Sequence, residues 1–205
     1  MTLPTSYSWF PVGQRQCVPY EASQGRRVNA IGAHFTHGPA AGDLHFRTWA
    51  CLPKSHAKKQ RKTPEQVAAG HGLTAAEVGA IDAQRLVDFI WRMAGREEVV
   101  GGEWKRERPL MVVLDNYSVH RSQVVREEEP ALAAADIHLV YLPSYSPELS
   151  AIEPVWHDVK QHHLPIRSFE RVGELKAAVD EALACKARKL RQVHAISTNI
   201  QQSDT

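Results

Sequence analysis

Two apolar runs separated by a helix-length segment constrain the fold more than any other feature of this sequence. "PLMVVLD" at 109–115 and "IHLVYLP" at 137–143 are rich in β-forming residues and do not alternate with polar ones. Such runs are typical of strands covered on both faces. The segment between them predicts a helix, broken near Pro130 because proline lacks the N–H that an inner turn needs. Strand, helix and strand of these lengths predict a right-handed crossover and a parallel pair.

An antiparallel hairpin is predicted earlier in the chain. Residues 26–37 and 44–52 alternate between apolar and polar side chains, and the Gly- and Pro-rich stretch "GPAAGD" separates them. Alternation is the pattern of a strand with one buried face, and the break supplies turn residues. Residues 53–80 are polar and contain several prolines and glycines. We expect an insertion on the surface there, with a short helix at "TPEQVAAG" that Thr63 caps.

Helical periodicity marks three further segments. "DAQRLVDFIWRMAG" at 82–95 begins with the N-cap residue Asp82 and ends at a glycine. Its predicted core face consists of Leu86, Phe89, Ile90 and Met93. Residues 151–163 and 168–192 also carry apolar side chains at helical spacing, whereas we expect the tail at 197–205 to be disordered.

Together these segments predict an α/β fold: a mixed sheet, formed by an antiparallel hairpin plus parallel strands, flanked by helices. The chain has 205 residues, of which 43% are hydrophobic, and this is enough for one packed core. It contains no apolar run long enough for a membrane span and no signal-peptide pattern. We therefore expect a soluble, cytoplasmic protein without a membrane partner. The three cysteines are far apart in sequence, which favours reduced thiols over disulfides or a zinc site.

The formal net charge of +2 argues neither for nor against a polyanionic partner, but the basic residues are unevenly distributed. The stretch "KSHAKKQRK" at 54–62 contains no acid. Its basic residues are Lys54, Lys58, Lys59, Arg61 and Lys62. They form a candidate DNA-binding segment that would meet phosphates. A solvated, mobile loop is an equally good interpretation, because charge runs often serve only to keep loops hydrated.

Two carboxylates follow the predicted parallel strands. Asp115 ends the first strand, and Glu153 lies in the first turns of a helix that begins beyond the second. Because the carboxyl ends of neighbouring parallel strands meet at one crevice, we expect both carboxylates there. Paired carboxylates repel each other, and a divalent cation such as Mg²⁺ or Mn²⁺ relieves the repulsion. The alternative for Asp115-Asn116 is a simple turn or helix N-cap.

The residues around both acids carry a family resemblance. "VVLDNYSVH" and "HLVYLPSYSPELSAIEPVW" resemble the DDE transposases of the insertion-sequence-630 branch of the Tc/mariner superfamily. Asp115 matches the second catalytic acid of that family and Glu153 the third, and the resemblance extends from about Ser8 to about Leu183. It implies a ribonuclease-H-like DDE catalytic domain over 1–183, followed by a helical end and tail at 184–205. It also implies two magnesium or manganese ions, and DNA cleavage and joining with a water or 3′-hydroxyl nucleophile.

Four neighbours of the two acids are candidates for supporting roles. Asn116 and His120 would orient Asp115 or touch phosphate, and the alternative is a turn asparagine and a surface histidine. Tyr145 and Ser146 would shape the loop ahead of Glu153 or contact the DNA backbone. The departure from the family pattern at Ser150-Ala151, where many relatives have Asn-Pro, preserves a residue that can cap the helix.

The first catalytic acid of the family has no match in this sequence. The family carries it on its opening strand, shortly before the equivalent of "YSWFPVGQ", whereas this sequence has no acid before Glu21. We therefore expect an N-terminally truncated transposase catalytic domain that is inactive alone. The alternative is a non-catalytic DNA-binding or interaction remnant that pairs with, or damps, a full-length transposase. A homodimer is a further expected partner state.

Overall fold

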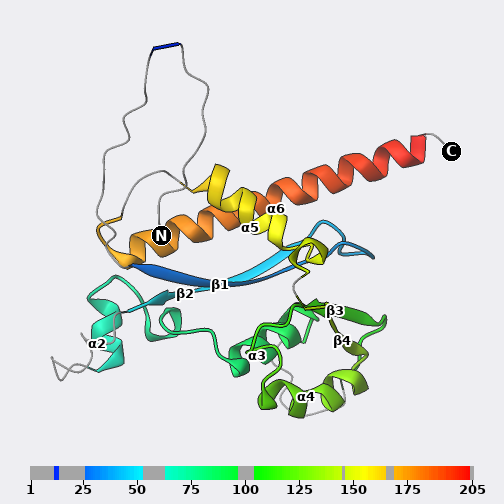
Figure 1. Ribbon diagram of the computed structural model, residues 1–205, viewed down its shortest axis with the longest axis horizontal. Coiled ribbons are helices and arrows are strands. Elements are labelled where there is room, and N and C mark those ends of the chain that lie inside the picture. The colour runs from blue at the N-terminus through cyan, green and yellow to red at the C-terminus, as the bar shows by residue number, and fades with distance from the viewer. Residues whose placement is uncertain are drawn as a thin grey trace. The chain divides into compact units, whose positions relative to one another are not determined.

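The computed structural model describes residues 12–13, 26–52, 63–96, 104–144, 146–164 and 169–203. It is a mixed α/β structure with an antiparallel strand pair and a parallel pair, flanked by helices (Figure 1). This confirms the predicted fold class and is compatible with a ribonuclease-H-like fold. The chain divides into two compact units, which are described separately. The first comprises Met1–Asn29, Thr48–Ala80 and Trp156–Arg188, and the second Ala30–Arg47, Ile81–Val155 and Lys189–Thr205.

The predicted hairpin is present as strands β1 (Arg27–His34) and β2 (Leu44–Cys51). Two backbone hydrogen bonds close its turn: Phe35 N–H donates to Asp43 O at 2.9 Å, and Gly42 N–H to Phe35 O at 2.8 Å. Gly42 has a φ of 87°, and a Cβ built on it would lie 2.7 Å from Cβ of His194. Glycine fits this position without strain. Any other residue would have to adopt an unfavourable positive φ, and its Cβ would clash with His194.

The predicted parallel pair is confirmed by strands β3 (Leu110–Leu114) and β4 (Ile137–Tyr141), which helix α4 (Gln123–Ala134) connects. The register pairs Leu110 with Ile137 at one end and Leu114 with Tyr141 at the other. Leu142 N–H donates to Leu114 O at 2.8 Å, so the pairing continues one residue beyond β4. Both strands therefore end at the same edge, where Asp115 begins.

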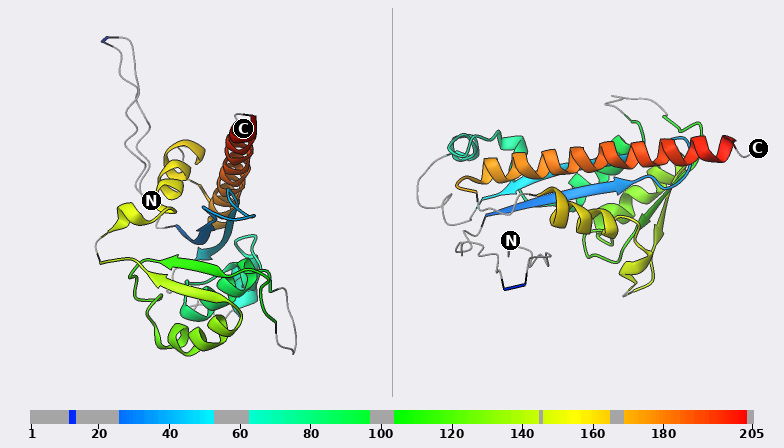
Figure 2. Two further views of the ribbon diagram at one scale, coloured as in Figure 1. Left: turned by 90° about the vertical axis from the view of Figure 1, so that its right-hand side faces the viewer. Right: turned by 90° about the horizontal axis from the view of Figure 1, so that it is seen from above.

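The prediction that β3 is covered on both faces is wrong. Val112 and Leu114 are each only 8% exposed, whereas Met111 is 66% exposed and Val113 is 55% exposed. When every residue of a strand is apolar, the sequence pattern carries no information about which face is buried. Helix α4 packs along β4 in both views of Figure 2, on the face that bears the buried side chains. β4 likewise alternates between buried or half-buried and exposed positions.

The core of the second unit joins these strands to helix α3 (Ala83–Met93). Asp82 caps this helix as predicted, because its Oδ1 accepts from Arg85 N–H at 2.9 Å. All four predicted core residues of the helix are buried. The most deeply buried side chains of this cluster are Ile90, Val125, Leu132 and Ile137. Burial of each such side chain contributes roughly 1.5–3 kcal/mol through the hydrophobic effect.

Helix α4 runs through Pro130 without a break, so the predicted interruption is wrong. Pro130 lies on the exposed side of the helix and cannot donate to the carbonyl of Arg126. Val125 and Leu132, both 0% exposed, lie on either side of it and pack in the same core cluster. This packing stabilises both halves of the helix and offsets the missing hydrogen bond.

The first unit contains a smaller core around helix α2 (Pro64–Ala69) and the short 3₁₀ helix η1 (Ala75–Glu77). Thr63 caps α2 as predicted, and Gln66 completes a capping box. The core consists of Ala50, Ala68, Leu73 and Val172. Residues 63–80, expected on the surface, therefore include side chains that build a core.

The C-terminal part of the chain is helical. A 3₁₀ helix η2 (Pro147–Leu149) precedes α5 (Glu153–Asp158), a π-helix η3 (Val159–His163) and the 32-residue α6 (Val172–Ser203). Figures 1 and 2 show α6 as one uninterrupted helix, so the expected disorder does not hold for 197–203. Ser197 Oγ and Thr198 Oγ1 each donate to the carbonyl four residues earlier at 3.0 Å, which lets these polar side chains bond within the helix. Over the described ranges, no helix combines the length and apolar character of a membrane span.

A nearly buried lysine links elements of the first unit. Lys176 is 8% exposed, and its Nζ lies 2.8 Å from Asp180 Oδ2 and 3.2 Å from Glu77 Oε1. Burial opposes the charged form of Lys176, but the hydrogen bonds and charges of Asp180 and Glu77 outweigh it and raise the pKa of the ammonium. The pKa of Glu77 is lowered by the backbone and side-chain hydrogen bonds from Thr74 and by Lys176.

Replacing Pro130 should stabilise the protein. In Pro130→Ala, residue 130 regains an N–H that can donate to the carbonyl of Arg126, and the helix is freed from the clash of the ring. We expect the free energy of unfolding to rise by about 1–3 kcal/mol in a urea titration. Pro64→Ala is the matched control, because a proline at the first helical position replaces an N–H that has no partner within the helix. A decrease in stability in Pro130→Ala would contradict this account.

Lys176→Met should destabilise the first unit by about 2 kcal/mol at pH 7, because it leaves two carboxylates without their cation. The sign of the pH dependence follows from both shifts. The contribution of Glu77 to the free energy of unfolding is lost as pH falls below 4.5, the ordinary pKa of a glutamate. The contribution of Lys176 is lost as pH rises through its pKa, which lies above 10.5. Urea titrations of wild type and variant should thus differ most between about pH 5 and 10.

Lys189→Met is the control for this experiment, because Lys189 is an exposed lysine on the same helix. It should change the free energy of unfolding little at any pH. Equal effects of the two substitutions would show that the ion pairs of Lys176 do not stabilise the unit.

Candidate active site

Asp115 follows β3 directly and forms a turn with the residues after it. Its Oδ1 accepts a hydrogen bond from Tyr117 N–H at 3.0 Å, and its side chain is 53% exposed. The interpretation of Asp115 as a turn residue is therefore correct for the backbone. It is not the cap of α4, because Ser122 occupies that position and accepts from Val125 N–H. Within the described ranges, the second carboxylate oxygen of Asp115 makes no hydrogen bond and is open to a ligand.

His120 orients the carboxylate of Asp115. Its Nδ1 lies 2.7 Å from Asp115 Oδ1 and 3.3 Å from Asp115 O, and the ring is largely shielded from solvent. Tyr117 packs against this ring edge-on, with 5.9 Å between the ring centroids. The histidine and the turn therefore both bind the same carboxylate oxygen of Asp115.

Asn116 connects the ends of the two parallel strands. Its Nδ2 donates to the carbonyl of Leu142 at 2.5 Å, directly beyond β4, and its Oδ1 accepts from Arg121 Nε at 2.6 Å. Both polar groups of the amide are thus used within the protein. Asn116 fixes the edge on which Asp115 lies rather than presenting its own side chain to a ligand.

Tyr141 extends this network beneath the turn. Its hydroxyl lies 3.0 Å from His120 O and 3.1 Å from Glu129 Oε1, and the guanidinium of Arg121 lies 4.8 Å from the centre of its ring. Burial, followed by the neighbouring carboxylate of Glu129, raises the pKa of Tyr141, so the hydroxyl stays protonated and able to donate. We did not predict roles for Arg121, Glu129 and Tyr141. The available signal was a tyrosine at the last position of β4.

Glu153 is the first residue of α5 and is reached from the end of β4 through residues 142–152. Its side chain is exposed, and among the described residues its carboxylate has no hydrogen bond or ion pair. Its N–H donates to Ser150 O at 3.1 Å, which forms the turn that begins the helix. An acid in the first turn is favoured by the helix dipole. Glu153 and Asp115 belong to the same compact unit.

The donor chemistry of these two residues fits a magnesium-type ion. Both offer carboxylate oxygens that are accessible to solvent, and Mg²⁺ is usually held by one or two carboxylates together with water. Over the described residues, no group of three or more His, Cys, Asp or Glu side chains is arranged to hold a metal.

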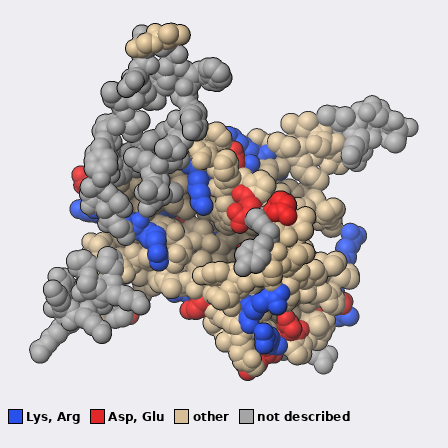
Figure 3. All heavy atoms as spheres, viewed as in Figure 1, with Lys and Arg blue, Asp and Glu red and all other residues tan. Residues whose placement is uncertain are grey.

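The remaining predicted site residues are placed only in part. Ser146 is described, and its Oγ donates to Ser144 O at 3.5 Å, which shapes the loop ahead of η2. Tyr145 and the candidate DNA-binding residues Lys54, Lys58, Lys59, Arg61 and Lys62 lie outside the described residues. Basic and acidic side chains are interspersed on the face shown in Figure 3.

Comparisons with known proteins identify a family for this chain. A search of curated proteins found no match. The family model described as DDE superfamily endonuclease matches residues 68–176, which is more than half of the chain and includes both Asp115 and Glu153. The matched segment contains α3, β3, α4, β4 and α5, the elements that position the two acids and their partners. The chain therefore belongs to the DDE superfamily endonucleases.

Proposed function

We propose that this protein is a transposase catalytic domain that cleaves and joins DNA strands with a divalent metal ion bound by Asp115 and Glu153. One observation carries the proposal: in a chain of the DDE endonuclease family, these two carboxylates keep oxygens that no described residue occupies. The carboxylates of Glu77 and Asp180, by contrast, are both engaged by Lys176. Open carboxylates are what a metal site requires before its ion binds.

Each residue of the site has a specific task in this proposal. Asp115 supplies the open oxygen to the ion, while His120 and the Tyr117 N–H hold the other oxygen. Glu153 supplies a second carboxylate from the first turn of α5. Asn116 keeps the strand ends at a fixed spacing. A bound Mg²⁺ or Mn²⁺, two ions in a complete site, would activate the attacking oxygen and stabilise the leaving oxygen of a phosphodiester.

Several finer assignments belong to the same proposal. The two motifs favour the insertion-sequence-630 branch of the Tc/mariner superfamily, and transposon-end and target DNA as partners. Only two acids in these 205 residues match the three catalytic positions of that branch. We therefore expect this polypeptide alone to be inactive as a transposase, with at most slow residual cleavage, because a missing ligand lowers the stabilisation of the transition state. A homodimer or pairing with a full-length transposase is the proposed state in the cell.

Asp115→Ala and Glu153→Ala should each weaken Mn²⁺ binding by at least about tenfold, since even outer partners of metal ligands contribute 10- to 100-fold. Mn²⁺ electron paramagnetic resonance measures this affinity without depending on turnover. A second measurement follows the nicking of circular DNA with the protein in excess. Wild type should cleave slowly in the presence of Mn²⁺, and each of the two substitutions should abolish this cleavage.

The control for these substitutions is Glu127→Gln, which removes an exposed acid on α4 in the same unit. It should leave both Mn²⁺ affinity and cleavage unchanged. Cleavage that persists in Asp115→Ala, or in the presence of a chelator, would rule out the proposed metal site.

His120→Ala should lower Mn²⁺ affinity about 10- to 100-fold, because Asp115 is then without the partner that orients its carboxylate. His120→Asn, which can still donate to Asp115 Oδ1, should recover part of this affinity. His138→Ala is the matched control, because His138 is an exposed histidine on β4, 4.0 Å from Asp136. If His120→Ala bound Mn²⁺ as tightly as wild type, the orienting role would be excluded.

A further inference from the structure

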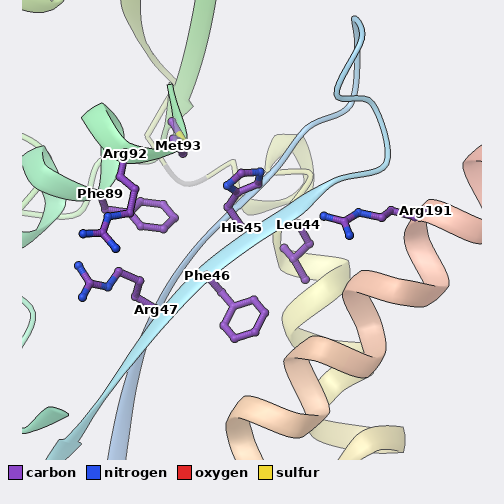
Figure 4. Close-up of a pocket in the computed structure, with 8 residues that line it drawn as sticks. All are labelled: Leu44, His45, Phe46, Arg47, Phe89, Arg92, Met93 and Arg191. Carbon is purple, nitrogen blue, oxygen red and sulfur yellow. The ribbon is translucent and has the colours of Figure 1, made fainter. Parts of the chain in front are cut away.

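We propose that a pocket between β2, α3 and the C-terminal part of α6 binds a phosphate group of the DNA backbone, as a contact additional to the two acids of the proposed active site. The pocket lies within the second unit and has a volume of about 230 Å³. Three arginines from three different elements line it: Arg47, Arg92 and Arg191. Figure 4 shows them together with His45 and Phe89.

The charge of the pocket is its distinguishing property. No acidic residue is among the side chains that line it. In Figure 4 the side chains of Arg47, from β2, and Arg92, from α3, point toward one another beside the ring of Phe89. Arginine does not lose its proton in proteins, so two guanidinium groups that share a pocket cannot reduce their repulsion by titration. An anion bound beside them would be attracted to both groups.

The individual arginines differ in how they are engaged. Arg92 is exposed, and no described acidic residue forms an ion pair with it. Arg191 uses its Nε for Asp43 at 2.5 Å, which leaves the terminal nitrogens of its guanidinium for other acceptors. Asp43 therefore holds Arg191 at the pocket without using all of its donors. Arg47 is also exposed and projects from the same face of β2 as His45.

Phosphate is the anion that this lining fits best. The planar fork of arginine matches phosphate oxygens with two parallel hydrogen bonds, and Phe89 and His45 offer flat rings beside the charged groups. The volume suits a phosphate with its sugar rather than a folded protein segment. The inference rests on the proposed function, because DNA is the polyanion on which a transposase domain acts. A free phosphate or nucleotide shares this chemistry, and binding experiments separate it from DNA.

A phosphate contact has a measurable signature in the salt dependence of DNA binding. Each phosphate that a protein cation neutralises releases counterions, so removing one such cation reduces the slope of log affinity against log salt by about 0.9. The test measures the affinity of wild type and of Arg47→Gln/Arg92→Gln for a labelled DNA duplex by fluorescence anisotropy at several salt concentrations. A chelator is present so that cleavage does not interfere. The double variant should bind about tenfold more weakly at 100 mM salt, and its slope should be smaller by about 1–2.

Two matched variants separate charge from other effects. Arg108→Gln removes an exposed arginine of the same unit outside the pocket, and it should change neither affinity nor slope. Arg47→Lys/Arg92→Lys retains both charges and should recover most of the salt slope, but less of the affinity, since lysine cannot bind two phosphate oxygens in the fork geometry. Thermal unfolding of all variants checks that the fold is intact, and both arginines are exposed enough to replace without disrupting a core.

The outcomes distinguish this inference from the proposed function. Equal affinity and slope in wild type and Arg47→Gln/Arg92→Gln would overturn the phosphate contact, even if Mn²⁺-dependent cleavage by wild type upheld the proposed function. Arginine-dependent DNA binding without any cleavage would support the contact and count against the catalytic proposal. Inorganic phosphate or a mononucleotide that binds wild type in this pocket, while duplex DNA does not, would also overturn the inference and identify a free anion as the ligand.

Discussion

The parallel pairing of β3 with β4 determines where the groups of the candidate site lie. Its register brings Leu114 opposite Tyr141, so both strands end at one edge, and the bond from Asn116 to the carbonyl of Leu142 fastens that edge. Asp115, His120 and Arg121 all come after β3 in the sequence, within seven residues of its end at Leu114. If the register shifted by one residue, Asn116 would lose its acceptor and Tyr141 would turn to the opposite face. The geometry of the candidate site therefore depends on the backbone pairing of β3 with β4 and on the hydrogen bond from Asn116.

Parts of this arrangement could be predicted from the sequence because they depend on local signals. The strand that ends in Asp115, the Asp82 cap and the core face of α3 follow from periodicity and capping patterns within a few residues. The contacts of Tyr141 with His120 and Arg121 could not be predicted, because they depend on the register between segments twenty or more residues apart. The exposure of Met111 and Val113 could not be predicted either, because it depends on which face of the strands the helices cover.

Tertiary contacts and side-chain hydrogen bonds explain the two helices that differ from their local signals. Proline favours a break in α4, yet the core contacts of Val125 and Leu132 on both sides of it keep the helix continuous. The end of α6 is rich in polar residues, which suggests disorder, but Ser197 and Thr198 bond within the helix itself. In both cases the composition of a segment was a poorer guide than the partners available to its residues.

The turn between β1 and β2 restricts which codons the gene can carry at position 42. Gly42 combines a left-handed backbone with a contact to His194 that leaves no room for a Cβ, so the turn and the last part of α6 meet at a position that accepts only a hydrogen atom. In the genetic code, every base change at the first or second position of a glycine codon introduces a side chain or a stop. Retaining this fold would thus require two nucleotides of the gene to stay unchanged, through steric exclusion alone.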